Sequence, residues 1–213
     1  MENKRFIKKF TNTNDYEAQK ESIMELPYVA LVDDTQKVIY GREKLFFQLN
    51  DGDVYDSKTT YKNVNIEYTR NFTNTKLQSW FVPFDVNVTD FQDKFTFYKI
   101  TNVNESNGSF SVHCETVDSG IIPANTPSVV QAKEVINFTF SIENTTLYNA
   151  KTNKIKILNN TNEYTFIGTY KGLYNGEMAA EKYYAMSNGM LNYTTNPSTS
   201  LKPFRWYCDI EEK

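Results

Sequence analysis

His113 is the only histidine among the 213 residues, so it is the one imidazole that a catalytic triad could use as a base. Cys114 follows it, and the two side chains together could form a thiolate-imidazole pair. The surrounding SVHCET pattern predicts a strand, however, and neighbouring side chains of a strand point to opposite faces. We therefore expect a half-exposed His113 and a Cys114 directed into the core. A lone histidine also argues against a His-based metal cluster.

Paired carboxylates are the second arrangement that could do chemistry, and Asp33 with Asp34 and Glu211 with Glu212 are adjacent in the sequence. Glycoside hydrolysis needs two carboxyl groups on opposite sides of a cleft, which adjacency does not provide. Turn chemistry explains Asp33 and Asp34 better. No glycine-rich phosphate loop occurs among the 8 glycines. The sequence therefore predicts a protein that is not an enzyme and has no cofactor or metal, with a depolymerase as the least favoured alternative.

Tyrosines gather in the stretch YKGLYNGEMAAEKYY, and exposed tyrosine rings can stack on sugars. A half-buried sheet also collects tyrosines, and that explanation is the commoner one. The candidate glycan-binding residues are Tyr170, Tyr174, Tyr183 and Tyr184.

Composition favours β structure, because 15% of the residues are aromatic and large rings prefer strands. The formal charge is -3 with both signs scattered, which argues against nucleic acid as a partner. No apolar run of about 18 residues occurs, and MENKRFIKKF lacks the apolar part of a signal peptide. We expect no membrane contact and synthesis in the cytoplasm. Cys114 and Cys208 are expected as free thiols, with a single bridge between them as the open alternative.

The first 48 residues predict a small β-α-β-β module. RFIKKF favours a strand, TNTNDYEAQKESIME a helix that begins with a capping Asn or Asp and stops at Pro27, and YVALVDDTQKVIYG a β-hairpin. A module of this size is marginal alone and needs a partner surface. We therefore interpret residues 1–48 as a docking module built on Phe6, Phe10, Tyr16, Val29, Leu31, Val38 and Tyr40.

Residues 49–63 are polar and predict a linker, and residues 64–213 predict a β-sandwich-like domain. Short strand-like runs, among them KYYAMSNGML, alternate there with Asn, Gly, Thr and Pro, and only VTDFQDKF and GEMAAEK favour short helices. In SWFVPFDV we expect Trp80, Val82 and Phe84 to alternate inward along one strand, with Pro83 at an edge or bulge. The fold class is mainly β, with a small N-terminal module followed by the sandwich.

Several segments occur in the order seen in a known group of domains: YTRNFTNTKLQSWFVPFDV, IIPANTPSVVQAKE, TTLYNAKTNKI, YTFIGTYKGL, YYAMSNGMLNYTT and SLKPFRWYCDIEEK. They resemble a β-rich C-terminal domain of proteins from Bacteroides, its relatives and their phages and prophages. The resemblance covers Val64 to Lys213 and departs at PSVVQAK, where that group often has an aromatic residue or a Leu-Ile pair.

The N-terminal part resembles modules at the start of structural proteins of Bacteroides phages, including crAss-like phages. The shared skeleton is P-x-V-x-x-x-x-D-x-x-x-V-x-Y, at Pro27, Val29, Asp34, Val38 and Tyr40. Together the two resemblances imply a virion component, anchored by its first module, that decorates the capsid or forms part of a head fibre. They imply other virion proteins as partners, a homo-oligomer and the virion as location. The alternative is a tail or surface adhesion module that binds host glycans.

Overall fold

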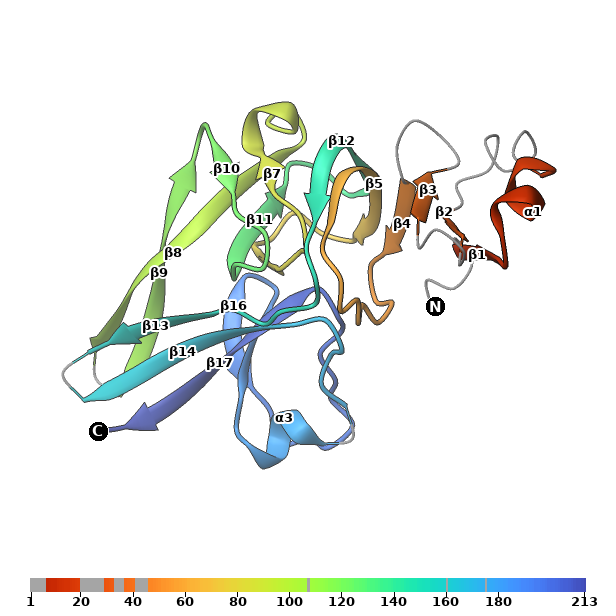
Figure 1. The fold of residues 1–213 in the computed structure, drawn as a ribbon. Coiled ribbons are helices and arrows are strands. Elements are labelled where there is room, and N and C mark those ends of the chain that lie inside the picture. The colour runs from red at the N-terminus through yellow and green to blue at the C-terminus, as the bar shows by residue number, and fades with distance from the viewer. Residues whose placement is uncertain are drawn as a thin grey trace. The chain divides into compact units, whose positions relative to one another are not determined.

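The computed structural model describes residues 7–19, 29–32, 37–40, 46–106, 108–159, 161–174 and 176–213, and the fold is mainly β (Figure 1). The chain forms two compact units. The first comprises Met1–Leu49, Tyr61–Thr69 and Thr139–Leu147, and the second comprises Asn50–Thr60, Arg70–Phe138 and Tyr148–Lys213. These units are divided differently from the predicted domains 1–48 and 64–213, because the segments Tyr61–Thr69 and Thr139–Leu147 belong to the first unit.

The predicted β-α-β-β order appears at the start of the first unit as β1 (Ile7–Phe10), α1 (Thr13–Glu17), β2 (Val29–Val32) and β3 (Lys37–Tyr40). Strand β1 runs parallel to β2, and β3 pairs with β2 in the antiparallel sense that a hairpin requires. The Asn12 side chain caps α1 by accepting a hydrogen bond from the backbone N–H of Asp15 at 2.9 Å. Helix α1 ends at Glu17 with Ala18 as its C-cap, before the predicted stop at Pro27, which lies outside the described residues.

A second sheet has the strand order β12-β5-β4, formed by β12 (Ile136–Leu147), β5 (Tyr61–Phe72) and β4 (Phe46–Asn50). Aromatic pairs hold the part of it that belongs to the first unit. The rings of Tyr68 and Phe140 stack at 6.1 Å, and those of Phe47 and Tyr61 lie 4.9 Å apart. Large rings on neighbouring strands therefore supply the core of this sheet.

The second unit contains a four-stranded, a five-stranded and a two-stranded sheet. The four-stranded sheet has the order β6 (Gln78–Trp80), β11 (Ser128–Ala132), β8 (Phe95–Ser106) and β9 (Ser109–Val117). The five-stranded sheet has the order β13 (Lys154–Leu158), β14 (Asn162–Thr169), β17 (Arg205–Glu212), β15 (Tyr184–Ser187) and β16 (Met190–Tyr193). Strands β7 (Val86–Asn87) and β10 (Ile121–Ile122) form the small sheet. The 3-10 helix η2 (Val88–Asp90) and the helix α3 (Glu177–Ala180) lie at the two places that the sequence predicted.

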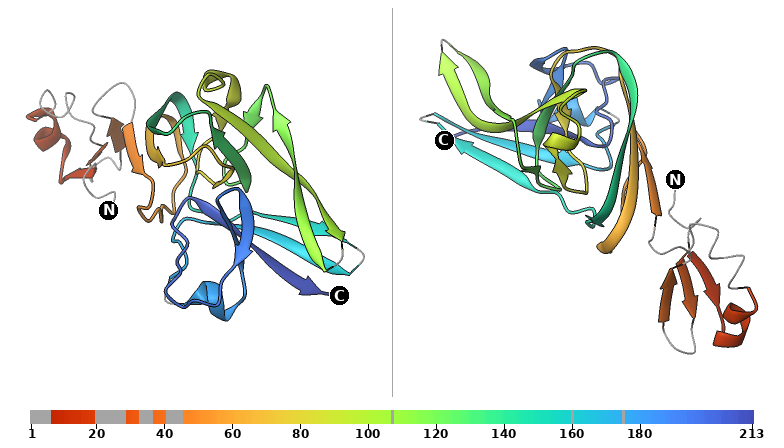
Figure 2. Two further views of the ribbon diagram at one scale, coloured as in Figure 1. Left: turned by 180° about the vertical axis from the view of Figure 1, so that it is seen from behind. Right: turned by 90° about the horizontal axis from the view of Figure 1, so that it is seen from above.

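The two larger sheets of the second unit form the layers of a sandwich, which Figure 2 shows as the green pair β8 and β9 against the cyan-to-blue strands. Their shared core is a cluster of buried side chains from both layers: Ile100, Val103, Val129, Tyr164, Phe166, Trp206 and Cys208. The indole N–H of Trp206 also donates to the carbonyl oxygen of Ser128 across the layers at 2.5 Å. The sandwich prediction is therefore confirmed for this unit.

The SWFVPFDV segment departs from the predicted alternation. Strand β6 ends at Trp80, and every residue from Trp80 to Phe84 is buried, Pro83 included. The ring of Trp80 contacts that of Phe97 at 5.7 Å, the ring of Phe81 contacts that of Tyr170 at 4.6 Å, and the carbonyl of Pro83 accepts from the Tyr148 N–H at 2.7 Å. The segment crosses the interior instead of lining one face, so both sets of side chains are covered.

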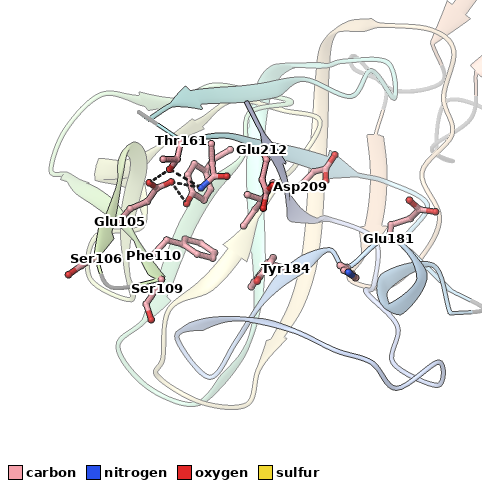
Figure 3. A pocket seen from close by; sticks show the side chains of 14 residues that line it. Glu105, Ser106, Ser109, Phe110, Thr161, Glu181, Tyr184, Asp209 and Glu212 are labelled. Carbon is pink, nitrogen blue, oxygen red and sulfur yellow. Dashed lines mark hydrogen bonds between the residues drawn. The ribbon is translucent and has the colours of Figure 1, made fainter.

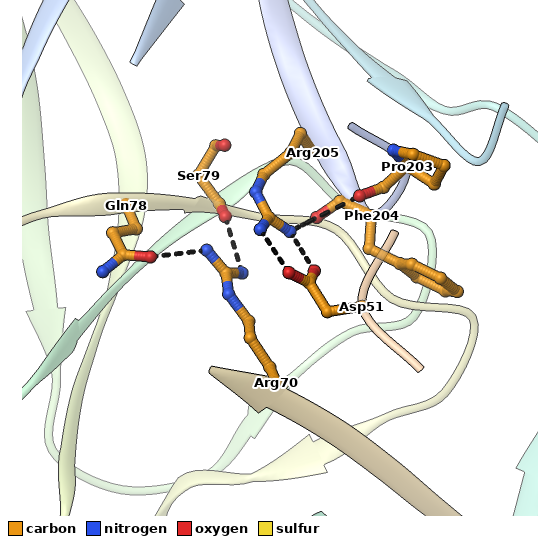
Figure 4. A network of polar contacts seen from close by, with 7 residues as sticks. All are labelled: Asp51, Arg70, Gln78, Ser79, Pro203, Phe204 and Arg205. Carbon is orange, nitrogen blue, oxygen red and sulfur yellow. Dashed lines mark hydrogen bonds and ion pairs between the residues drawn. The ribbon is translucent and has the colours of Figure 1, made fainter. Parts of the chain in front are cut away.

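Two arginines of the second unit are held inside it (Figure 4). Arg70 is 1% exposed, and it donates to the carbonyl of Ser79 at 3.0 Å and to the Gln78 amide oxygen at 2.8 Å. Arg205 forms a bidentate ion pair with the Asp51 carboxylate. Burying a guanidinium is costly unless it is paired and hydrogen-bonded. Arg205 meets that condition through its ion pair with Asp51, and Arg70 donates to two uncharged acceptors, those of Gln78 and Ser79.

Candidate functional site

A hollow of about 750 Å³ opens at one end of the sandwich in the second unit (Figure 3). Its lining comes from the β8-β9 hairpin, the start of β14, the turn before β15 and the end of β17. The lining residues are Glu105, Ser106, Gly108, Ser109, Phe110, Thr161, Asn162, Tyr164, Glu181, Lys182, Tyr184, Asp209, Ile210 and Glu212. Its volume lies in the range of ligand-binding pockets.

The hollow exists because β15 follows β17 for only a short distance. The two strands pair at Tyr184 with Cys208 and at Ala185 with Tyr207. Just before this pairing, Lys182 adopts a left-handed backbone conformation with φ 54°. This conformation is uncommon for a residue other than glycine, and it turns the chain away from β17. The last four residues of β17 are therefore left with β14 as their strand neighbour on one side and the hollow on the other.

Glu105 forms one wall and is fixed by three donors. Its carboxylate accepts from the hydroxyl of Thr161 at 2.6 Å, the hydroxyl of Tyr164 at 2.6 Å and the side-chain amide of Asn162 at 2.8 Å. These hydrogen bonds lower the pKa of Glu105 from its usual value, and the one from Thr161 lowers it most. Burial and the bond to Glu105 raise the pKa of Tyr164. The β8-β9 hairpin is thereby tied to the start of β14, and Glu105 stays ionised.

Three further carboxylates belong to residues that line the hollow, Glu181, Asp209 and Glu212, of which Asp209 and Glu212 lie on opposite faces of β17 (Figure 3). None of them accepts a hydrogen bond or forms an ion pair within the described part of the chain. Lys182 is the one basic side chain among the described lining residues. The hollow is therefore negatively charged and favours cationic groups over anionic ones.

Aromatic rings make up the apolar part of the hollow. The ring of Phe110 lies 5.1 Å from that of Tyr164 and 5.1 Å from that of Tyr184, the latter in an edge-to-face arrangement. Phe110 and Tyr184 are half buried and pack against the sandwich core. The lining thus combines ring surface with carboxylates, a combination that suits cationic side chains.

The four tyrosines predicted to bind glycans do not form one face. Tyr170 is 3% exposed, and its hydroxyl donates to the Asn125 side chain, so it belongs to the interior. The Tyr183 ring lies tilted against that of Tyr207 at 4.5 Å, Tyr174 is 40% exposed, and Tyr184 lines the hollow. Including Tyr170 in the candidate site was wrong, because the ring is enclosed by the Phe81 and Phe204 rings.

Of the residues predicted for the docking module, Phe10 and Tyr16 are both buried, at 4% and 6% exposure, and meet edge to face at 5.7 Å. The other described members lie on the two strands of the hairpin, where Val29 is opposite Tyr40 and Leu31 is opposite Val38. Phe6 lies outside the described residues, as do Asp33 and Asp34.

His113 and Cys114 lie as predicted for a strand. His113 is exposed, and Cys114 is half buried and packs against the core cluster. Burial raises the pKa of Cys114, and it raises the pKa of Cys208 to about 12. Both are free thiols in this structure. Neither has the lowered pKa of a nucleophilic cysteine.

Sequence patterns did not point to the hollow, because its carboxylates come from separate segments between Glu105 and Glu212 and carry no shared motif. Within the described ranges, no cluster of three His, Cys, Asp or Glu side chains could hold a metal ion. In the same ranges, no helix is long and apolar enough to cross a membrane.

Comparison of the chain with models of known protein families, with curated protein sequences and with solved structures returns no significant match. The resemblance to Bacteroides phage proteins therefore stays a prediction.

Proposed function

We propose that the chain is a non-enzymatic structural protein of a Bacteroides-type phage particle, either a capsid decoration protein or part of a head fibre. The observation that supports this most is the separate β1-β2-β3 sheet formed within the first 40 residues. Strands β1 and β3 are the two edges of this sheet, and edge strands present unpaired backbone groups that can pair with another protein. We propose that this sheet docks the chain on the particle.

The second unit would then be the part that faces outward. A sandwich with a packed aromatic core suits that role, because it does not depend on the particle for its stability. Its partners would include other virion proteins and further copies of the same chain. Synthesis would take place in the host cytoplasm, with the virion as the final location.

The docking proposal is tested by removing residues 2–40, which deletes β1, β2 and β3 while keeping all of β4. Cells that produce particles are supplied with the tagged full-length chain, with the deletion variant, or with a Tyr174→Ala variant of the second unit as control. The full-length and Tyr174→Ala chains are expected in gradient-purified particles, and the deletion variant is not. Incorporation of a folded deletion variant at the full-length ratio would overturn the docking role of this sheet.

The alternative is a tail or surface adhesion module that binds host glycans. Two of the tyrosines predicted for it remain candidates, since Tyr174 is exposed and Tyr184 lines the hollow. Tyr170 is enclosed and no longer supports a glycan site. The alternative requires saturable binding to host capsular polysaccharide that weakens in Tyr174→Ala or Tyr184→Ala. Unchanged binding in both variants would remove these rings from the site.

A further inference from the structure

Strand β17 has an unpaired backbone edge beside the hollow. In an antiparallel pair, successive residues point their N–H and C=O groups alternately toward and away from the partner strand. The N–H of Lys213 donates to the carbonyl of Thr161 on the β14 side, at 3.0 Å. Counting back in steps of two, Glu211 and Asp209 also face β14, opposite Glu163 and Thr165. Ile210 and Glu212 must then point their backbone groups the other way.

The strand that would satisfy those groups is β15, and it stops short of them. Its pairing with β17 begins at Tyr184 opposite Cys208, so the position opposite Ile210 falls to Lys182. Lys182 is in the left-handed conformation, and its N–H bonds back to the carbonyl of Ala179 at the end of α3. Within the described residues, no strand pairs with Ile210 or Glu212 on this side.

We propose that this edge is a docking site for an extended, basic segment of a partner protein, which adds as a strand beside the last four residues of β17. An added strand would continue the line of β15, and the hollow provides the room for it. Strand addition takes its affinity from main-chain hydrogen bonds and its specificity from the side chains on either face.

Charge on the hollow selects the occupant. The carboxylates of Glu181, Asp209 and Glu212 form no hydrogen bond or ion pair within the described residues, and Glu105 adds a fourth negative charge against the one basic lining residue described, Lys182. Lysine or arginine side chains of an added strand would meet these carboxylates, and their stems would lie on the rings of Phe110 and Tyr184. An acidic peptide or an acidic glycan would be repelled. The site rests on the geometry of the second unit and does not depend on the phage assignment.

The test uses the full-length chain and the peptide acetyl-KTKVKTK-amide, with binding followed by titration calorimetry and by amide hydrogen exchange. A second peptide has the same sequence with N-methyl groups on alternate residues, which removes main-chain donors and keeps the charge. A third, acetyl-ETEVETE-amide, reverses the charge. We expect the first peptide to bind, the second to bind at least about tenfold more weakly, and the third not to bind.

Amide exchange locates the strand. Addition of the first peptide is expected to slow the exchange of the Ile210 and Glu212 amides by about tenfold or more, whereas that of Glu211, which already faces β14, stays unchanged. Equal binding of the N-methylated peptide, or binding without protection at Ile210 and Glu212, would overturn strand addition and leave a charge contact alone. Binding of maltohexaose in place of the peptide would also overturn the proposal and would support the glycan alternative.

Two neighbouring carboxylates provide the matched variants. Glu212 lines the hollow, whereas Glu211 does not, and both are exposed on the same strand. Glu212→Gln is expected to weaken the peptide about threefold or more, and Glu211→Gln to leave its affinity unchanged. Asp209→Asn and Glu181→Gln give two more lining variants. Equal effects of Glu211→Gln and Glu212→Gln would contradict the location of the site.

Discussion

The guanidinium of Arg205 donates two hydrogen bonds to the carboxylate of Asp51, Nη1 to Oδ1 at 2.5 Å and Nη2 to Oδ2 at 2.8 Å. The two residues are 154 positions apart in the sequence. Their side chains are 14% and 13% exposed, so the pair is largely shielded from water. This ion pair fixes the loop after β4 to the start of β17 within the second unit.

Removing one partner should leave the other charge partly buried and unpaired. We expect Asp51→Ala to lower the free energy of unfolding by about 2 kcal/mol, measured by urea titration. The exposed pair of Lys94 and Glu134, with side chains 39% and 54% exposed, is the matched control. Glu134→Ala should leave the unfolding midpoint unchanged. Equal effects of the two variants would contradict the importance of shielding.

Gly168 of β14 lies directly against the ring of Phe81, and a Cβ atom at this glycine would fall 2.0 Å from a ring carbon. We expect Gly168→Ala to destabilise the second unit by about 2–3 kcal/mol through overpacking. In a Phe81→Leu background, Gly168→Ala should destabilise the second unit less, because the ring atoms that the added Cβ would meet are absent. A double-mutant cycle by thermal unfolding measures this coupling, and simple additivity would show that the strain arises elsewhere.

Trp80 is fully buried and contacts both Phe97 and the guanidinium of Arg70. Trp80→Ala should therefore lower the free energy of unfolding by about 3–5 kcal/mol. Tyr174→Ala, at a position 40% exposed, serves as the control and should change it by less than about 0.5 kcal/mol. A Trp80→Ala variant as stable as the wild type would place this residue outside the core.

Glu105 should make stability depend on pH at the acid end. Its pKa in the folded chain is lowered from 4.5, so the unfolded chain binds a proton there more readily than the folded chain does. Its contribution to stability is present above pH 4.5 and is lost as the pH falls through the lowered folded pKa. The Tm of the wild type is therefore expected to drop more steeply below pH 4.5 than that of Glu105→Gln.

Thr161→Val provides the control for that pH dependence, because it removes the hydrogen bond that lowers the pKa of Glu105 most and keeps the carboxylate. Its acid-side loss of Tm should fall between those of the wild type and Glu105→Gln. If all three chains lost Tm in parallel between pH 6 and pH 3, the Glu105 hydrogen bonds would have no role in acid stability.

The sequence was sufficient for the fold class because its local patterns match the local structure. The antiparallel pairing of β2 with β3 and the strand of His113 and Cys114 follow from the strand-like runs and their two-residue period. KYYAMSNGML, treated as one run, is instead the hairpin of β15 and β16. Asn188 and Gly189 both have positive φ there, and this Asn-Gly pair is the turn that could have been predicted.

The site was less predictable, because it depends on pairing between distant segments. That Tyr61–Thr69 and Thr139–Leu147 belong to the first unit cannot be derived from either stretch alone. The hollow depends on the left-handed backbone of Lys182, a residue type that gives no sign of that conformation. Its carboxylates then meet through tertiary structure alone.

Peptide mass spectrometry of gradient-purified phage particles tests the central proposal most directly, with the amount of this chain scaled to the major capsid protein. We expect the chain in the particles at a fixed ratio. Hundreds of copies per particle would identify a capsid decoration protein, and about a dozen would place it at the portal, tail or a fibre. Its absence from purified particles, while it is abundant in the producing cells, would contradict the virion assignment.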